Sequence, residues 1–344
     1  MRGLSWPLAD EPHLEAWTDY AREAQEKGAL PALRERLVQL RFPVEEGISQ
    51  TDTYRAATRR GVLPWAAGPG LELADPDGLR LRLEPTLSGR IPILTVALRQ
   101  DFEALVRALS GRNEPIPVPP SMGACIVTGL NNWDRVGRLR RAFEAARGGE
   151  PDDAAWAEEF ARLVPQRELY QDRFIILSSG PYSAVPAADL GLADDAWRRR
   201  SLEIRTAHEC THYLTHRAYG RMRNNLLDEL IADFAGLLQV DGAYDASLAL
   251  RFLGLEDYPR WREGGRLSSY LGDPPLPPSS TAVLHTLVHR AVRNLAACCA
   301  ARAPRAGDAQ RWALALAGLT LEELAAEDMP ARLAASLDAV PAAH

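Results

Sequence analysis

Residues 197–219 of the chain read WRRRSLEIRTAHECTHYLTHRAY, with no proline or glycine to interrupt a helix. His208 and His212 are four residues apart in this run, so on a helix they lie on one face, one turn apart. Two imidazoles in that register can bind one Zn²⁺ at about 2.0–2.1 Å. Glu209, which follows the first histidine, can then reach a metal-bound water as a general base. The stretch therefore predicts a helix that carries a metal site of the H-E-x-x-H type.

A second helix is expected at residues 225–235, one short polar loop downstream. Glu229 and Asp233 fall beside its apolar stripe, and a carboxylate on the core side is costly unless it is paired or binds a metal. We therefore predict Glu229 as the third ligand and Asp233 as the group that holds a ligating histidine by its free ring nitrogen. Asp228 points to the opposite side and is expected to be solvated, although a one-residue error in helix phase would make it the ligand. The stripe consists of Leu226, Leu230, Phe234 and Leu237.

The pair of helices resembles the gluzincin branch of zinc metallopeptidases, which includes thermolysin and the small ImmA/IrrE-like proteases. The resemblance covers residues 197–240, and residues 229–233 (Glu-Leu-Ile-Ala-Asp) match the pattern of that branch on the second helix. It implies zinc ligands at His208, His212 and Glu229. It also implies a general base at Glu209 and an orienting carboxylate at Asp233. The metzincin branch fits poorly, because Thr215 stands where its helix-breaking glycine would be.

Other functions remain open at this point. Two histidines and one carboxylate also form the facial triad of non-haem Fe(II) oxygenases, so Fe²⁺ is the alternative to Zn²⁺. A third hypothesis is a binding or regulatory protein that has kept the zincin scaffold but has lost catalytic activity. Glu209 favours hydrolysis, because an oxygenase needs no general base there. Each histidine could also be an ordinary core residue, although the combination of two histidines, Glu209 and Glu229 favours the metal site.

Composition indicates a soluble globular protein, with 344 residues, 46% hydrophobic and 25% charged. The net charge of −6 gives no global electrostatic case for binding nucleic acid. The four cysteines show no C-x-x-C spacing, which suits a reducing compartment. The first residues lack the apolar region of a signal peptide, and no apolar stretch is long enough to span a membrane. We therefore expect a cytoplasmic protein without membrane association.

The expected fold class is α+β, a zincin-like domain with a small mixed sheet packed on the metal helix. A helical region at residues 1–68 precedes a catalytic domain at 69–344, made of a sheet-containing lobe (69–220) and a helical lobe (221–344). Helices are expected at about residues 12–40, 51–61, 102–109, 135–147 and 153–163. Strands are expected at residues 79–83, 93–98, 124–128 and 173–178, where apolar or alternating runs end at turn residues.

The resemblance also indicates how a substrate would bind. In the gluzincins, a strand just before the metal helix borders the cleft and pairs with an extended peptide. Here that would be the strand at 173–178, with Ile176 and Ser178 as substrate-binding residues, unless it is a plain structural strand. Relatives stabilise the oxyanion with a histidine or tyrosine from the C-terminal part. The candidates are Tyr270, His285 and His289, of which the histidines could equally be core residues. The expected partner is a peptide or protein substrate.

Overall fold

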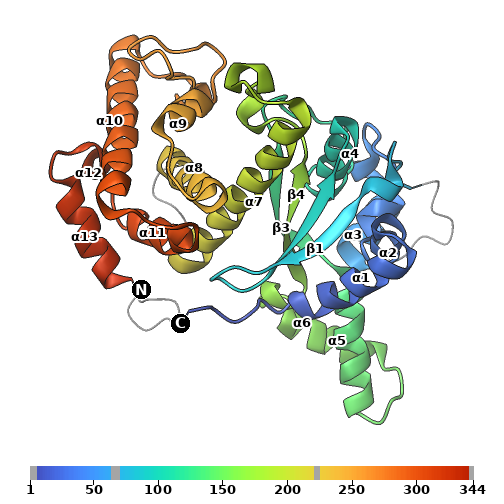
Figure 1. Cartoon of the computed structure of the whole chain (residues 1–344). Coiled ribbons are helices and arrows are strands. Elements are labelled where there is room, and N and C mark those ends of the chain that lie inside the picture. Colours follow the sequence, from blue (N-terminus) through green and yellow to red (C-terminus); the bar gives the residue numbers. More distant parts are fainter. Residues whose placement is uncertain (1–5, 63–69, 221–224, 341–344) are drawn as a thin grey trace.

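The computed structural model describes residues 6–62, 70–220 and 225–340. A small four-stranded sheet lies between two groups of helices (Figure 1). The predicted α+β class, with a small mixed sheet packed on the metal helix and helix-rich N- and C-terminal regions, is confirmed. The predicted boundary between residues 68 and 69 lies outside the described residues.

The sheet has the strand order β1-β2-β4-β3. It consists of β1 (Arg80–Glu84), β2 (Ile91–Val96), β3 (Ala124–Asn131) and β4 (Gln171–Ser178). β2 and β4 are parallel, and the other two pairings are antiparallel. β4 is therefore a central strand, which agrees with the complete burial of residues 174–177. β3 forms one edge of the sheet.

Helices from the first part of the chain cover one face of this sheet. They are α1 (Leu14–Lys27), α2 (Ala29–Arg36) and α4 (Arg99–Leu109), with α3 (Asp52–Arg60) beside them. Trp17 and Phe102 pack in one apolar cluster with Phe174 and Ile176 of β4. The N-terminal helices are thus a wall of the sheet's own core. The predicted helix at 12–40 is divided at Gly28, whose φ of 90° favours glycine.

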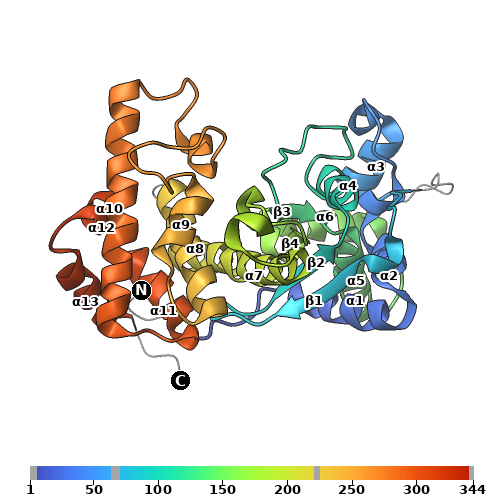
Figure 2. The ribbon, with the colours of Figure 1, turned by 45° about the horizontal axis from the view of Figure 1, so that its top comes forward.

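The other face of the sheet packs on α7 (Asp194–Tyr219), where Cys210 and Tyr213 contact Ile175 and Leu177. Beyond α7 lies a helical lobe (Figure 2). It contains α8 (Asn225–Asp241), α9 (Ala246–Leu253), α10 (Pro278–Arg302), α11 (Ala309–Leu316), α12 (Leu321–Ala325) and α13 (Met329–Ala339). The remaining helices, α5 (Trp133–Ala146) and α6 (Asp153–Leu163), connect β3 to β4. α7, the helix that carries His208 and His212, therefore lies between the sheet and the helical lobe.

The helices and the cysteines relate to the surroundings in which the chain folds. In the described ranges, no helix is both long enough and apolar enough to cross a membrane. The four cysteines are free thiols, and three of them are buried.

Candidate metal centre

The metal centre is built by α7 and α8, which pack along each other. Their backbones come close at Gly236, where an added Cβ would lie 3.0 Å from the carbonyl oxygen of Ile204 and 3.7 Å from the nitrogen of His208. A larger residue would push α8 away from α7 one turn from the first histidine. The predicted apolar stripe of α8 is buried in the core. Packing thus fixes the position of the α8 carboxylates relative to the α7 histidines.

His208, His212 and Glu229 converge as predicted. One ligand atom from each lies within 4.8 Å of the others. The two Nε2 atoms are 2.9 Å apart, and each is 3.5 Å from a carboxylate oxygen of Glu229. Two imidazole lone pairs that face each other repel unless a cation or a proton lies between them. The donor set therefore fits a small divalent metal such as Zn²⁺, with two nitrogens and one carboxylate.

In each of the two histidines, a carboxylate contacts Nδ1, the ring nitrogen that faces away from the other histidine. Asp233 Oδ1 lies 3.0 Å from Nδ1 of His208, and Asp228 Oδ2 lies 2.8 Å from Nδ1 of His212. An Nδ1–H that donates to a carboxylate leaves Nε2 free for the metal, fixes the ring and makes the ligand more basic. Asp233 thus lies against the ring nitrogen of His208 at which the prediction places it.

The prediction that Asp228 is solvated is wrong. Its side chain is buried and also accepts a hydrogen bond of 3.0 Å from the Thr215 hydroxyl. The reason is that α8 is buried on nearly every side, so the side opposite the apolar stripe faces α7 and not water. Asp228 contacts Nδ1 of His212, and Glu229 remains the candidate third ligand.

Tyr182 and Arg266 complete the arrangement, and the sequence did not reveal them. The Tyr182 hydroxyl lies 2.7 Å from both Nδ1 of His208 and Oδ1 of Asp233. Arg266 forms an ion pair with Asp233 and donates to the Tyr182 hydroxyl at 3.3 Å. Burial and the Asp233 charge raise the pKa of Tyr182 well above its usual value, so the hydroxyl stays protonated. Burial would raise the pKa of Asp233, but Arg266 and His208 together lower it, so the carboxylate stays charged.

A pocket of about 330 Å³ opens beside the ligands. His208, Glu209 and Glu229 line it from the helices, together with Arg266 and Tyr270. Burial and the nearby Glu229 charge raise the pKa of Tyr270, which keeps its hydroxyl a hydrogen-bond donor. Glu209 and Tyr270, both predicted to be catalytic, therefore face the same space as the metal ligands.

The other two catalytic candidates are not brought to this pocket. His289 stacks on Tyr258 with ring centroids 4.1 Å apart and lines a different pocket. His285 packs near Trp261, with ring centroids 5.2 Å apart. Both lie on α10, whose histidine-bearing face meets the residues after α9 and not the metal ligands. The expectation that His285 or His289 assists at the metal is corrected accordingly.

The substrate-binding role of Ile176 and Ser178 is also corrected. Both lie on the central strand β4, between β2 and β3, so this strand has no free edge for a peptide. Ile176 is fully buried in the core. The carbonyl oxygen of Ser178 accepts a hydrogen bond of 2.6 Å from Arg205, a buried residue of α7. β4 therefore supports the wall of the pocket from behind.

The edge strand beside the pocket is β3. Gly123 and Ala124, at the start of this strand, line the pocket beside His208 and Glu209. Gly123 leaves room for the guanidinium of Arg205, whose Nε would lie 2.6 Å from an added Cβ. Arg205 also donates to the carbonyl oxygens of Gly180 and Pro181, at 3.0 and 3.1 Å. Arg205 therefore connects α7 to the end of β4 by hydrogen bonds and packs against Gly123 at the start of β3.

Comparison with known proteins gives a family but no function. The chain belongs to the family described as "Family of unknown function (DUF7005)", whose model matches residues 2–328. Searches of the curated proteins and of the solved structures find no match to the chain. The family spans both the sheet and the helical lobe, so the metal centre lies within the matched region.

Proposed function

We propose that this protein is a zinc-dependent peptidase that hydrolyses peptide bonds in the pocket between the sheet and the helical lobe. The observation that carries the proposal is the joint arrangement of the ligands. The Nε2 atoms of His208 and His212 meet at Glu229, while each Nδ1 is held by a carboxylate. Glu209 lines the same pocket. Free thiols suit a reducing compartment such as the cytoplasm, where we place the protein.

Each residue has a distinct task in this reaction. His208, His212 and Glu229 would hold Zn²⁺, which when bound polarises a carbonyl group and lowers the pKa of a water molecule. Glu209 accepts the proton of the attacking water and passes it to the departing amine. The Tyr270 hydroxyl donates a hydrogen bond to the carbonyl oxygen as negative charge develops on it.

The edge of β3 positions the substrate in this proposal. An extended peptide that adds to this edge gains backbone hydrogen bonds, and its part beside Ala124 enters the pocket that His208 and Glu209 line. The Fe(II) oxygenase gains no support from the structure, because Glu209 faces the pocket and an oxygenase has no need of a base there. An inactive scaffold is disfavoured because ligands, base and hydroxyl donor are all in place.

Metal analysis of purified protein tests the proposal. The wild type should hold about one zinc per chain, Glu229→Ala should lose it, and Glu209→Gln should keep it. Loss of one proton acceptor should lower peptide cleavage by about 10²–10⁴-fold in Glu209→Gln. A wild type that takes up no zinc when supplied with it, or one that holds iron and consumes oxygen, would overturn the assignment.

A further inference from the structure

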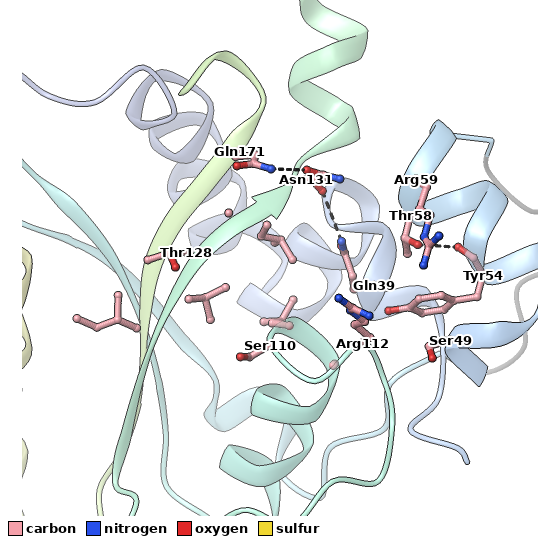
Figure 3. Close-up of a pocket in the computed structure, with 16 residues that line it drawn as sticks. Gln39, Ser49, Tyr54, Thr58, Arg59, Ser110, Arg112, Thr128, Asn131 and Gln171 are labelled. Atoms are coloured by element: carbon pink, nitrogen blue, oxygen red, sulfur yellow. Dashed lines mark hydrogen bonds between the residues drawn. The ribbon is translucent and has the colours of Figure 1, made fainter. Parts of the chain in front are cut away.

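A second, polar pocket of about 510 Å³ lies along the open edge of β3 (Figure 3). Residues 126–131 form one wall, and Tyr54 and Arg59 of α3 contribute to another. The residues that follow α4, Ser110 and Arg112, complete the lining. The pocket shares β3 with the metal centre but none of its catalytic residues.

The chemistry of this pocket suits an acidic group. Arg59 and Arg112 are exposed, and within the described residues neither has a hydrogen bond or an ion pair. Thr58 lies in the same lining, and its hydroxyl donates to the carbonyl oxygen of Tyr54 at 2.8 Å. The side chain of Gln39, only 5% exposed, has an Oε1 atom without a partner among the described residues. This oxygen is an acceptor, so it suits a peptide N–H, and the two arginines are the donors that suit an acidic group.

Arg112 is also held in place by an unusual backbone. Its φ is 58°, and that of Asn113 is 60°, in the left-handed region that costs ordinary residues free energy. The buried side-chain amide of Asn113 stabilises this turn by donating to the carbonyl oxygens of Gln39, Phe42 and Pro43 at 3.0–3.2 Å. The turn therefore presents Arg112 to the pocket from a fixed position.

The edge of β3 connects the two pockets. Ser178 N donates to Gly123 O at 2.9 Å, so the alternation of an antiparallel pair directs the backbone groups of Ala124, Ile126 and Thr128 away from β4. Ala124 lines the metal pocket, and Thr128 lines the polar pocket. At about 3.3 Å per residue, the four steps between them span about 13 Å. A β-bulge between Thr128 and Leu130 then ends the regular edge.

We propose that the polar pocket binds an acidic side chain of the same peptide that is cleaved at the metal centre. The inference rests on the proposed function and adds a substrate class, peptides with a Glu or Asp about four residues from the cleaved bond. A peptide that pairs with β3 from Ala124 to Thr128 brings its next side chains to Arg59 and Arg112. Two guanidinium groups on one carboxylate form charge-assisted hydrogen bonds, which gives a role to two arginines that have no partner among the described residues.

Binding of fluorescent peptides to zinc-loaded Glu209→Gln protein tests the inference without requiring turnover. Twelve-residue peptides with one Glu are compared with the same peptides carrying Gln, with the Glu moved along the sequence. The measurement is repeated after adding Arg59→Ala and Arg112→Ala together. The matched control is Arg60→Ala, which removes an exposed arginine of the same helix that does not line the pocket.

We expect the Glu peptides to bind about tenfold more tightly, as charge-assisted hydrogen bonds predict. The double arginine variant should abolish this difference, and the control should retain it. Equal binding of Glu and Gln peptides, or a preference that survives in the double variant, overturns the inference.

Cleavage by the wild-type protein separates the two proposals. Cleavage of both peptides at equal rates refutes the acidic subsite and leaves the peptidase standing. Arginine-dependent binding without any zinc-dependent cleavage refutes the peptidase and leaves an acidic-peptide site. A preferred Glu position directly beside the cleaved bond would contradict the placement of the subsite at Thr128.

Discussion

Replacement of Asp228 by alanine should weaken zinc binding although Asp228 is not a ligand. The change removes the carboxylate that lies 2.8 Å from Nδ1 of His212. Loss of such an outer partner typically lowers metal affinity 10–100-fold, which corresponds to about 1.4–2.7 kcal/mol. Asp228→Asn should have a smaller effect, because the amide oxygen can still accept the hydrogen bond while the charge is lost.

The same change has a predictable effect on thermal stability. At a zinc concentration of about 100 times the wild-type Kd, bound metal stabilises the fold by about 2.7 kcal/mol. If the Kd of the variant is 100-fold higher, the same zinc stabilises it by only about 0.4 kcal/mol. Most of the rise in melting temperature on addition of zinc should therefore disappear in Asp228→Ala.

Chelator competition and thermal melts with and without zinc provide the assay. Asp241→Ala is the matched control, because Asp241 also lies on α8 but pairs with Arg200 away from the metal ligands. Wild-type zinc affinity in Asp228→Ala would refute the claim that this carboxylate orients His212. An equal loss in the control would show that the effect comes from α8 as a whole.

Three further predictions concern Tyr270, Arg266 and the buried His13. Tyr270→Phe should lower kcat more than it raises KM in steady-state peptide kinetics, because the hydroxyl hydrogen-bonds the carbonyl oxygen mainly in the transition state. A rise in KM with an unchanged kcat would refute this role. Arg266→Met should weaken zinc binding in a chelator titration, because it leaves Asp233 buried without its cation; unchanged affinity would refute it. Burial beside cationic arginines lowers the pKa of His13 to about 3, so only the unfolded chain binds its proton between pH 6.5 and 3. The free energy of unfolding should fall as pH drops through that window, by up to about 2 kcal/mol from pH 7.5 to 5. Urea unfolding at the two pH values should show a smaller fall in His13→Phe than in the wild type. An equal fall in both proteins would contradict the reasoning.

The helix pair and the convergence of His208, His212 and Glu229 could be predicted because the pattern is local in sequence. The spacing of His208 and His212 fixes their shared face, and Glu229 follows on the next helix. The role of Asp228 could not be predicted in the same way. Its helix is surrounded by protein, so its polar positions do not mark a solvent face.

Tyr182 and Arg266 could not be predicted because they lie in short 3-10 helices far apart in sequence, and only tertiary packing brings them to Asp233. The position of β4 was different, because the sequence contained a signal for it. Its uninterrupted apolar run at residues 174–177 is typical of a strand buried on both faces, as the central strands of a covered sheet are. That run therefore favours a central position for β4, as the sheet order shows.

The most direct test of the central claim is digestion of a peptide library by zinc-loaded wild type and by zinc-loaded Glu209→Gln, with products identified by mass spectrometry. We predict discrete cleavage products from the wild type, which disappear when a chelator is added. Glu209→Gln, which keeps its zinc, should give none above background. Equal products from both proteins, or none from a wild type that holds one zinc per chain, would contradict the account.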